Sequence, residues 1–202
     1  MPQESAHSPS LEVEMKYPLT DTASVVQRLN QLGARELGSE HEQDIYFASP
    51  DRDFAKTDEA LRLRRTANRL WLTYKGPRLD PLSKTREEIE VELTSPAVFE
   101  QACDLLEHLG YRILVGLYKE RRIYELDWRG YTVKVCLDNV SRLGQFVELE
   151  TRVGQPELTT ARRALQSLAQ ELGLQQSERR SYLELMLEQL RRLPPDDLLP
   201  QE

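Results

Sequence analysis

The stretch LEVEMK, residues 11–16, alternates apolar and charged side chains near the start of the chain. On a β-strand, a period of two residues places Glu12, Glu14 and Lys16 on one face and the intervening apolar side chains on the other. The apolar face is therefore expected to meet a core. The other face carries carboxylates beside an ammonium group, so it is expected to meet an ionic partner.

The same alternation recurs along most of the other segments that have strand character, where the charged side chains of each strand share one face. One explanation is an outer face exposed to water, with cross-strand ion pairs. The other is a sheet curled into a tunnel with a charged lumen and an apolar exterior covered by helices. The polar residues of shared parity are Glu12, Glu14, Lys16, Arg62, Arg64, Thr73, Lys75, Arg86, Glu88, Glu90, Lys119, Arg121, Lys134, Asp138, Glu148 and Glu150.

A tunnel that carries both signs of charge suits a polyphosphate bound together with divalent cations. Arg and Lys neutralise phosphate oxygens through charge-assisted hydrogen bonds, and Arg can do so with a bidentate fork. Carboxylates would repel the same phosphate unless a cation stood between them. Mg²⁺ or Mn²⁺ takes oxygen ligands from carboxylates and phosphates together, so the residue types indicate a metal-assisted site for a triphosphate.

The elements that must position these residues can be predicted from periodicity. Apolar residues at helical spacing predict helices over 21–32, 96–109 and 157–172, each of which ends on Leu-Gly, and Asp21 is the predicted N-cap of the first. Hairpin turn signals such as Leu143-Gly144 favour an α+β fold, an eight-stranded antiparallel β-barrel or tunnel with a charged lumen and flanking helices. Two-residue alternation predicts strands over about 11–16, 40–48, 60–65, 69–76, 87–93, 111–125, 130–138 and 146–150.

Composition excludes several classes of partner. Lys and Arg number 27 against 34 Asp and Glu, a net charge of −7, so duplex nucleic acid is not an expected partner. No apolar run approaches the roughly 20 residues that cross a bilayer, so no membrane partner is expected. Cys103 and Cys136 lie in apolar periodic segments without a secretory signal before them, which favours free thiols and a cytoplasmic location.

The ends of the chain differ in composition from its centre. Residues 1–10 predict a disordered leader, and the prolines of 191–202 predict a tail that cannot continue a helix, which leaves one domain over 11–190. The segment GPRLDPLS at 76–83 is long for a hairpin and lies between Lys75 and Arg86. It is a plain surface loop or a loop that closes over one tunnel mouth.

In its motifs and in their order, the chain resembles the CYTH superfamily of triphosphate tunnel enzymes. The N-terminal motif ExExK corresponds to Glu12, Glu14 and Lys16. The LDNVSRLGQFVELE segment is most similar to the class IV adenylyl cyclase branch of the superfamily. The other matching segments are QDIYF (43–47), ALRLRR (60–65), LTYKGP (72–77), REEIEVEL (86–93), YKERRIYEL (118–126), VCLDNVSRLGQFVELE (135–150) and SYLELML (181–187).

The resemblance implies that the tunnel binds a triphosphate with Mg²⁺ or Mn²⁺. Catalytic roles fall on Glu12, Glu14, Lys16 and Arg121, whereas Arg122 lies on the opposite face of its strand and is left out. The phosphate ligands implied by the resemblance are Lys16, Arg62, Arg64, Lys75, Arg86, Lys119 and Arg121. The implied metal ligands are Glu12, Glu14, Glu90, Asp138, Glu148 and Glu150.

The favoured function is that of a class IV adenylyl cyclase, which converts ATP to cyclic AMP and pyrophosphate. Hydrolysis of inorganic tripolyphosphate or of thiamine triphosphate stays open, as does non-catalytic binding of a polyphosphate or nucleotide. No Ser-His or Cys-His pairing is evident in the sequence, so a metal-bound hydroxyl or water is a better nucleophile than a side chain. The residues do not distinguish these substrates, and a homodimer is left open.

Overall fold

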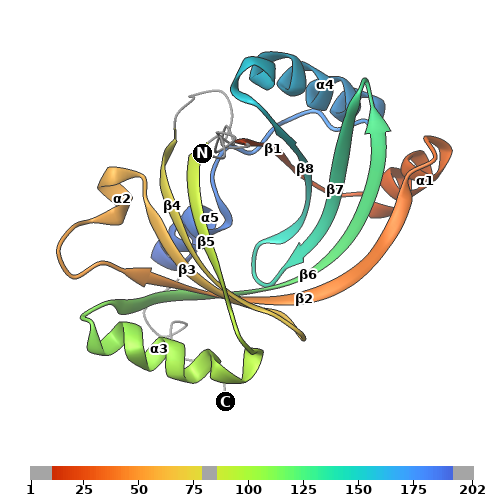
Figure 1. The fold of residues 1–202 in the computed structure, drawn as a ribbon. Helices are drawn as coiled ribbons and strands as arrows, with labels where there is room; N and C mark the ends of the chain where they lie inside the picture. Colours follow the sequence, from red (N-terminus) through yellow and green to blue (C-terminus); the bar gives the residue numbers. More distant parts are fainter. Residues whose placement is uncertain (1–10, 79–85, 193–202) are drawn as a thin grey trace, which may run out of the picture.

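A computed structural model describes residues 11–78 and 86–192, in which eight antiparallel strands form one curled sheet. The strand order is β1-β8-β7-β6-β2-β3-β4-β5, so β1 and β5 are the edge strands. Figure 1 shows the long strands β2 and β6 side by side, with β7, β8 and β1 on one side and β3, β4 and β5 on the other. This arrangement confirms the predicted antiparallel tunnel fold. The strands are β1 (Leu11–Pro18), β2 (Arg35–Ala48), β3 (Ala60–Arg65), β4 (Leu70–Arg78), β5 (Arg86–Leu93), β6 (Arg112–Trp128), β7 (Tyr131–Val140) and β8 (Gly144–Val153).

The three predicted helices are confirmed, and two further helices are present. The helix predicted over 21–32 is α1, and those predicted over 96–109 and 157–172 are α3 and α4, each preceded by a short 3-10 turn. The side chain of Asp21 accepts a hydrogen bond from the amide of Ser24, as expected of an N-cap. No helix in the described ranges is long and apolar enough to cross a membrane. The helices are α1 (Thr22–Gln31), α2 (Phe54–Thr57), α3 (Phe99–His108), α4 (Leu158–Glu171) and α5 (Tyr182–Arg192).

The Leu-Gly pairs that follow α1, α3 and α4 end these helices by the same geometry. Gly33, Gly110 and Gly173 have φ values of 75°, 91° and 76°, and residues that carry a Cβ atom rarely adopt such values. After α1, the amide of Ala34 donates to the carbonyl of Leu29 over 3.0 Å, the long hydrogen bond of a Schellman motif. The chain therefore reverses direction sharply after each helix and enters the next segment.

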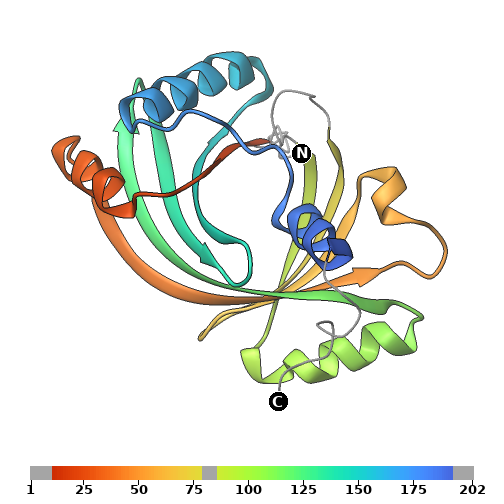
Figure 2. The ribbon, with the colours of Figure 1, turned by 180° about the vertical axis from the view of Figure 1, so that it is seen from behind.

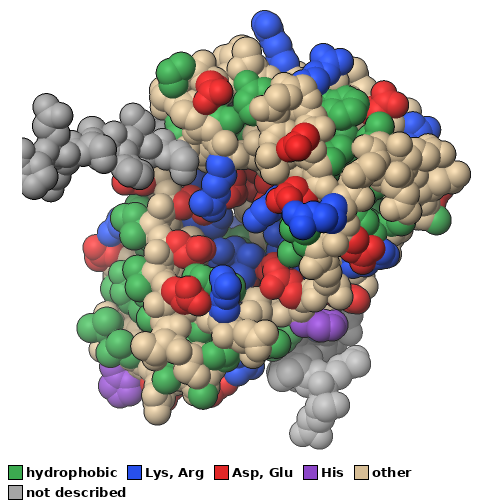
Figure 3. Space-filling view, turned by 45° about the vertical axis from the view of Figure 1, so that its right-hand side comes forward, with side chains coloured by type: hydrophobic (Ala, Val, Ile, Leu, Met, Phe, Trp, Pro, Cys, Tyr) green, Lys and Arg blue, Asp and Glu red, His purple; other side chains and the backbone are tan. Residues whose placement is uncertain are grey.

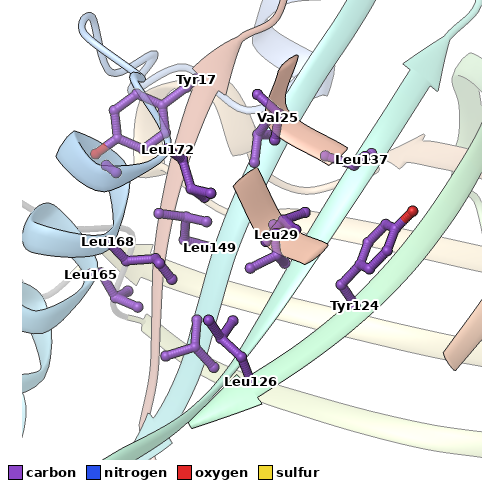
Figure 4. Packing of buried hydrophobic residues seen from close by; sticks show 14 of the residues in the cluster. Tyr17, Val25, Leu29, Tyr124, Leu126, Leu137, Leu149, Leu165, Leu168 and Leu172 are labelled. Carbon is purple, nitrogen blue, oxygen red and sulfur yellow. The ribbon is translucent and has the colours of Figure 1, made fainter. Parts of the chain in front are cut away.

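The main core lies between α1, α4 and the outer face of β1, β7 and β8. Figure 4 shows Val25 and Leu29 of α1 and Leu165 and Leu168 of α4 around Leu149 of β8. Burying each of these side chains stabilises the fold by roughly 1.5–3 kcal/mol. Because the apolar residues of these strands face the helices, the charged residues that alternate with them must face the inside of the curl.

The other two apolar clusters lie on opposite faces of the sheet. On the outer face, α3 packs Phe99 and Leu106 against Phe47 and Leu63. On the inner face, α5 contributes Tyr182 and Met186, which pack against side chains that share the parity of the charged residues, namely Tyr46, Leu117, Val140 and Phe146. In Figure 2, which views the molecule from behind, α5 lies in front of the strands. Unlike the helices that cover the exterior, α5 therefore covers part of the lumen.

Several elements differ from the sequence prediction. The sequence analysis does not predict α2 or α5, and β2 begins at Arg35, earlier than the expected residue 40. The tail expected from residue 191 begins later, because α5 continues through Arg192. The leader and residues 193–202 lie outside the described ranges. Of the predicted loop at 76–83, the part up to Arg78 belongs to β4, and the remainder is outside the described ranges as well.

Candidate active site

The inside of the curl contains a cavity of about 980 Å³, a volume within the range that holds small organic ligands. Figure 3 shows a hollow in which Lys, Arg, Asp and Glu side chains gather. Of the predicted site residues, all but Lys16 and Asp138 line this cavity. Those that line it are Glu12, Glu14, Arg62, Arg64, Lys75, Arg86, Glu90, Lys119, Arg121, Glu148 and Glu150.

Arg64 of β3 is held by two carboxylates of β2. Its Nε and Nη2 donate to the two oxygens of Asp44 over 2.6 and 2.7 Å, and its Nη1 lies 2.7 Å from Glu42 Oε2. Burial alone would raise the pKa of Asp44, but Arg64 and Arg62 outweigh it and hold this pKa well below its usual value. Glu42 also pairs with Lys119 Nζ at 3.0 Å. This part of the lumen is therefore an interlocked set of buried ion pairs.

Arg121 of β6 is the centre of a second set. Its Nε and Nη2 donate to the two oxygens of Asp138 over 2.7 and 2.6 Å, and Nη2 also donates to Glu148. Its Nη1 lies 3.5 Å from Glu150 Oε1, and Lys119 Nζ lies 3.6 Å from Asp138 Oδ2. Because Arg121 faces three acidic side chains of β7 and β8, its charge is balanced inside the protein before any ligand binds.

Arg62 of β3 is held more loosely than either of these arginines. Its Nη2 donates to the Thr73 hydroxyl over 3.3 Å, and its shortest carboxylate distances are 3.8 Å to Asp44 and 4.0 Å to Glu90. Its buried Nε has no hydrogen-bond partner among the described residues. A buried N–H group without a partner costs free energy, so Arg62 can accept an anionic ligand at little cost to its existing contacts.

Lys75 and Arg86 lie on the neighbouring strands β4 and β5. Lys75 Nζ donates to Glu88 Oε1 over 2.6 Å, and burial followed by the charge of Arg62 lowers the pKa of this lysine. Arg86 donates to backbone carbonyl oxygens, at 3.3 Å from Gly76 and 3.5 Å from Asp58. Its shortest carboxylate distance among the described residues is 4.0 Å, from Nη2 to Asp58 Oδ1, so much of the positive charge of Arg86 remains available to a bound anion.

Carboxylates gather on β1 and β8, across the cavity from Arg62 and Arg64. Glu14 of β1 lies directly opposite Glu150 of β8 in the antiparallel register. Burial is the main cause that raises the pKa of Glu150 to about 8, and the Glu12, Glu148 and Glu14 carboxylates add to this effect against the opposing charge of Arg121. Like charges placed opposite each other destabilise a sheet, so this part of the lumen favours a bound cation.

The carboxylates also meet the chemical requirements of a divalent cation site. Burial, Glu88 and Glu14 together raise the pKa of Glu12, and a divalent cation near these oxygens would favour their ionised forms. Mg²⁺ and Mn²⁺ prefer such oxygen ligands and complete their coordination with water and phosphate. Within 11–78 and 86–192, no three acidic, histidine or cysteine side chains converge as a preformed metal site. The residues therefore fit a cation that a phosphate ligand helps to hold.

The two predicted residues outside the cavity lining lie behind it. Lys16 is buried, and its Nζ lies 3.9 Å from the ring centroid of Tyr182. Asp138 is buried between Arg121 and the Tyr182 hydroxyl. The roles assigned to all the predicted site residues stay predictions, and direct contact with a ligand is best supported for those that line the cavity.

The structure adds residues that the sequence analysis did not list. Glu42 and Asp44 lie on the inner face of β2, opposite Lys119 and Arg64 in the registers, where the two-residue period that revealed the other strands would have identified them. Tyr182 lines the cavity from α5, and its SYLELML segment matched the family without receiving a role. Arg122 donates to Glu36 on the outside of the sheet, in agreement with its exclusion from the site.

The CYTH domain model matches residues 10–182, which is most of the chain, and the protein therefore belongs to the CYTH family. A Methanocaldococcus jannaschii protein provisionally named adenylate cyclase is 35% identical over 178 residues, covering 87% of this chain and 98% of the relative. Adenylate cyclase CyaB of Aeromonas hydrophila is 32% identical, covering 85% of this chain and 86% of the relative. The solved structure of the PH1819 protein from Pyrococcus horikoshii matches with a TM-score of 0.79 and 40% identity, covering 88% of this chain and 99% of that chain.

These matches define the class of the protein. CYTH domain proteins are enzymes, are in general metal-dependent and act on small-molecule triphosphates. The chain is therefore a CYTH-type enzyme with its relatives in the adenylate cyclase branch. The cavity described above is the candidate site of that activity.

Proposed function

We propose that this enzyme is a class IV adenylyl cyclase, which converts ATP to cyclic AMP and pyrophosphate with Mg²⁺ or Mn²⁺. The observation that carries the proposal is the opposition of charges in one cavity. Cationic side chains of β3, β4 and β6 line the same space of about 980 Å³ as the carboxylates of β1 and β8. A triphosphate would meet Arg and Lys with its oxygens, and its cations would meet the glutamates.

The cationic residues would divide the work of holding the triphosphate. Arg62 and Arg86 have donors or charge not fully used by carboxylates, so they are the first candidates for direct phosphate contact. Arg64 and Arg121 are fixed by bidentate pairs and would provide a preorganised positive field. Lys75 contacts Glu88 at the less enclosed wall and would turn from it towards an incoming phosphate.

In the reaction, the ribose 3′-hydroxyl attacks the α-phosphorus in line with the leaving pyrophosphate. A bond forms between that oxygen and the α-phosphorus, the bond from the α-phosphorus to the bridging oxygen breaks so that pyrophosphate leaves with this oxygen, and the hydroxyl proton passes to water. Divalent cations held by Glu12, Glu14 and Glu150 would lower the pKa of the attacking hydroxyl and offset negative charge on the phosphates. Arg62, Arg64 and Arg121 would stabilise the charge that develops in the transition state.

A product assay tests the proposal. Purified protein is incubated separately with ATP, tripolyphosphate and thiamine triphosphate, each with Mg²⁺, with Mn²⁺ or with a chelator, and the products are separated by chromatography. Cyclic AMP and pyrophosphate in equal amounts, formed from ATP only when a cation is present, are the expected result. ATP left intact, or converted to ADP and orthophosphate, would contradict the cyclase proposal.

Hydrolysis of a triphosphate is the second candidate, and the composition of the inner wall favours it. The residues that β3, β4 and β5 turn towards the lumen include Arg62, Arg64, Thr73, Lys75 and Glu90, all charged or hydroxyl-bearing. A bare tripolyphosphate would satisfy such a wall without a nucleoside. Orthophosphate released from tripolyphosphate or thiamine triphosphate would identify this activity. Thermal stabilisation by a triphosphate without any product would identify a binding protein.

A further inference from the structure

Tyr182 occupies a fixed place at the start of α5. Ser181 and Glu184 form a reciprocal capping box around it, in which the Glu184 amide donates to the Ser181 hydroxyl over 3.1 Å and the Ser181 amide donates to the Glu184 carboxylate over 2.6 Å. Arg78 of β4 donates to the same Glu184 over 3.0 Å and to Asp58 over 2.8 Å. These contacts hold the first turn of α5 against the sheet, so the direction of the Tyr182 side chain is set.

The ring of Tyr182 faces two of the predicted phosphate ligands. Lys16 Nζ lies 3.9 Å from the ring centroid and Lys119 Nζ lies 5.5 Å from it. Phe146 packs edge-on against the same ring at a centroid distance of 5.2 Å. An ammonium group over an aromatic face is attracted by the ring quadrupole, and the attraction is largest when both are removed from water. Lys16, Lys119 and Tyr182 are all buried, so this arrangement meets that condition.

The hydroxyl of Tyr182 completes the surroundings of Asp138. It donates to Asp138 Oδ2 over 2.8 Å. Arg121 occupies both oxygens of the same carboxylate, and Lys119 Nζ lies 3.6 Å from it. The Asp138 side chain is fully buried and does not line the cavity. Its oxygens are thus directed at protein donors, which is the geometry of a structural anchor and differs from that of a ligand that faces a bound cation.

From these contacts we propose that Tyr182 and Asp138 are a positioning pair for the cations of the site. Asp138 fixes the guanidinium of Arg121, and the Tyr182 ring fixes the ammonium groups of Lys16 and Lys119. The Tyr182 hydroxyl joins the two halves of this arrangement. The inference rests on the proposed function, since it concerns how a triphosphate is held. It assigns to Asp138 a role other than the metal ligation implied by the family resemblance.

The test separates the ring of Tyr182 from its hydroxyl. Tyr182→Phe keeps the ring above the lysines and removes only the hydrogen bond that joins Tyr182 to Asp138, so KM for the triphosphate should rise by a smaller factor, about three-fold. Tyr182→Leu removes the aromatic face as well and should raise KM about ten-fold, since two cation–π contacts are lost. Tyr118→Phe and Tyr118→Leu are the matched controls, because Tyr118 precedes Lys119 on β6 but is exposed on the outer face.

Asp138→Asn tests the second half of the pair. It should raise KM for the triphosphate about ten-fold, because Arg121 and Lys119 lose a shared counter-charge, and it should leave the Mg²⁺ or Mn²⁺ concentration for half-maximal activity unchanged. Folded fraction is measured for every variant by circular dichroism and thermal unfolding. Affinity for tripolyphosphate is measured in parallel from its stabilising effect on unfolding, so the test does not depend on turnover alone.

The outcomes are distinguishable. A KM raised about ten-fold in Tyr182→Leu and about three-fold in Tyr182→Phe, together with unchanged cation dependence in Asp138→Asn, would support the pair. A fall in kcat that follows the folded fraction at constant KM would show a merely structural role and overturn it. A higher cation requirement in Asp138→Asn at constant KM would restore the metal-ligand assignment. A wild type that binds and converts no triphosphate would refute the proposed function instead.

Discussion

The two walls of the cavity balance their charges in different ways. In the wall of β2, β3, β6 and β7, each buried arginine faces a carboxylate from a neighbouring strand, as Arg64 faces Asp44 and Arg121 faces Asp138. In the wall of β1 and β8, carboxylates face one another, as Glu14 and Glu150 do in the register. The protein alone completes the first wall. The second brings acidic side chains together whose pKa values are raised, as for Glu12 and Glu150, and cations from solution would favour their ionised forms.

This difference suggests separate tasks for the two walls. Ion pairs buried in a low-dielectric interior keep their geometry because breaking one leaves a charge without compensation. The wall of β2, β3, β6 and β7, the arginine wall, should therefore be rigid and should tolerate substitution poorly. Carboxylates that repel one another are stabilised by a bound cation. The stability and geometry of the wall of β1 and β8, the glutamate wall, should therefore depend strongly on metal.

The largest expected effect is on turnover, from the loss of a glutamate that faces the lumen. Glu14→Ala should lower metal-dependent turnover more than about 100-fold, because a cation ligand is lost. The variant should remain folded, since Glu14 faces another carboxylate, Glu150, in the strand register. Initial rates against Mg²⁺ concentration and thermal unfolding check both statements. Glu120→Ala, on the exposed outer face of β6, is the control. Full activity of Glu14→Ala would remove the glutamate wall from the mechanism.

The next effect separates two neighbouring arginines of β3. Arg64→Gln should lower the free energy of unfolding by about 3 kcal/mol, because Asp44 and Glu42 each lose their shortest ion pair inside the protein. Arg62→Gln should lower it less and should weaken tripolyphosphate binding about ten-fold, since Arg62 has donor capacity for a ligand. Denaturant unfolding with and without tripolyphosphate measures both quantities. Equal losses of unfolding free energy and of tripolyphosphate affinity in the two variants would show that Arg62 and Arg64 do not have separate roles.

Acid should weaken the arginine wall in a defined window. The pKa of Asp44 is lower in the folded protein than in the unfolded chain, so its pairing stabilises the fold above the unfolded pKa of about 3.8. This stabilisation is lost as pH falls below that value. The difference in free energy of unfolding between the wild type and Asp44→Asn should therefore be constant from pH 7 to about pH 5 and should narrow below it. A difference that widens on acidification would show that Asp44 is not ionised at neutral pH.

The smallest effect is expected at the rim. Arg152 pairs with Glu12 at 3.3 Å, but the Arg152 side chain is 72% exposed, so water and salt screen the interaction. Arg152→Gln should change the free energy of unfolding by less than about 0.5 kcal/mol. Denaturant unfolding at low and high salt checks this value. A loss as large as that of Arg64→Gln would show that exposure does not govern the strength of these ion pairs.

Much of the fold and of the cavity lining could be predicted from the sequence, because the alternation along each strand separates residues that face the helices from residues that face the lumen. Helices cover the apolar face of the sheet, so residues such as Glu12, Arg62 and Arg121 must face inward. The Leu-Gly signals were sufficient to place the ends of three helices, since the left-handed backbone conformation favours glycine.

The rest of the site depends on how deeply each side chain is buried and on which residues it contacts. The alternation of residues along one strand does not specify either. Lys16 has the inward parity, yet it lies behind Tyr182 because α5 covers that end of the lumen. The pairing of Arg121 with Asp138 follows from the registers of β6, β7 and β8, which no single strand reveals. The start of α5 did have a local signal, the S-x-x-E of a capping box at Ser181, but the sequence analysis assigned no secondary structure to the SYLELML segment.

The sharing of Arg121 by Glu148 and Glu150 has a thermodynamic consequence. Both glutamates are predicted cation ligands, and oxygens that turn towards a cation are less available to Arg121. The Arg121 donors that turn away from Glu148 and Glu150 can then bind phosphate while Asp138 still holds the guanidinium, so cation and triphosphate should each raise the affinity for the other. Linkage requires the two effects to be equal in free energy. The enzyme would then select the metal–triphosphate complex over either component, through a coupling that originates in one shared side chain.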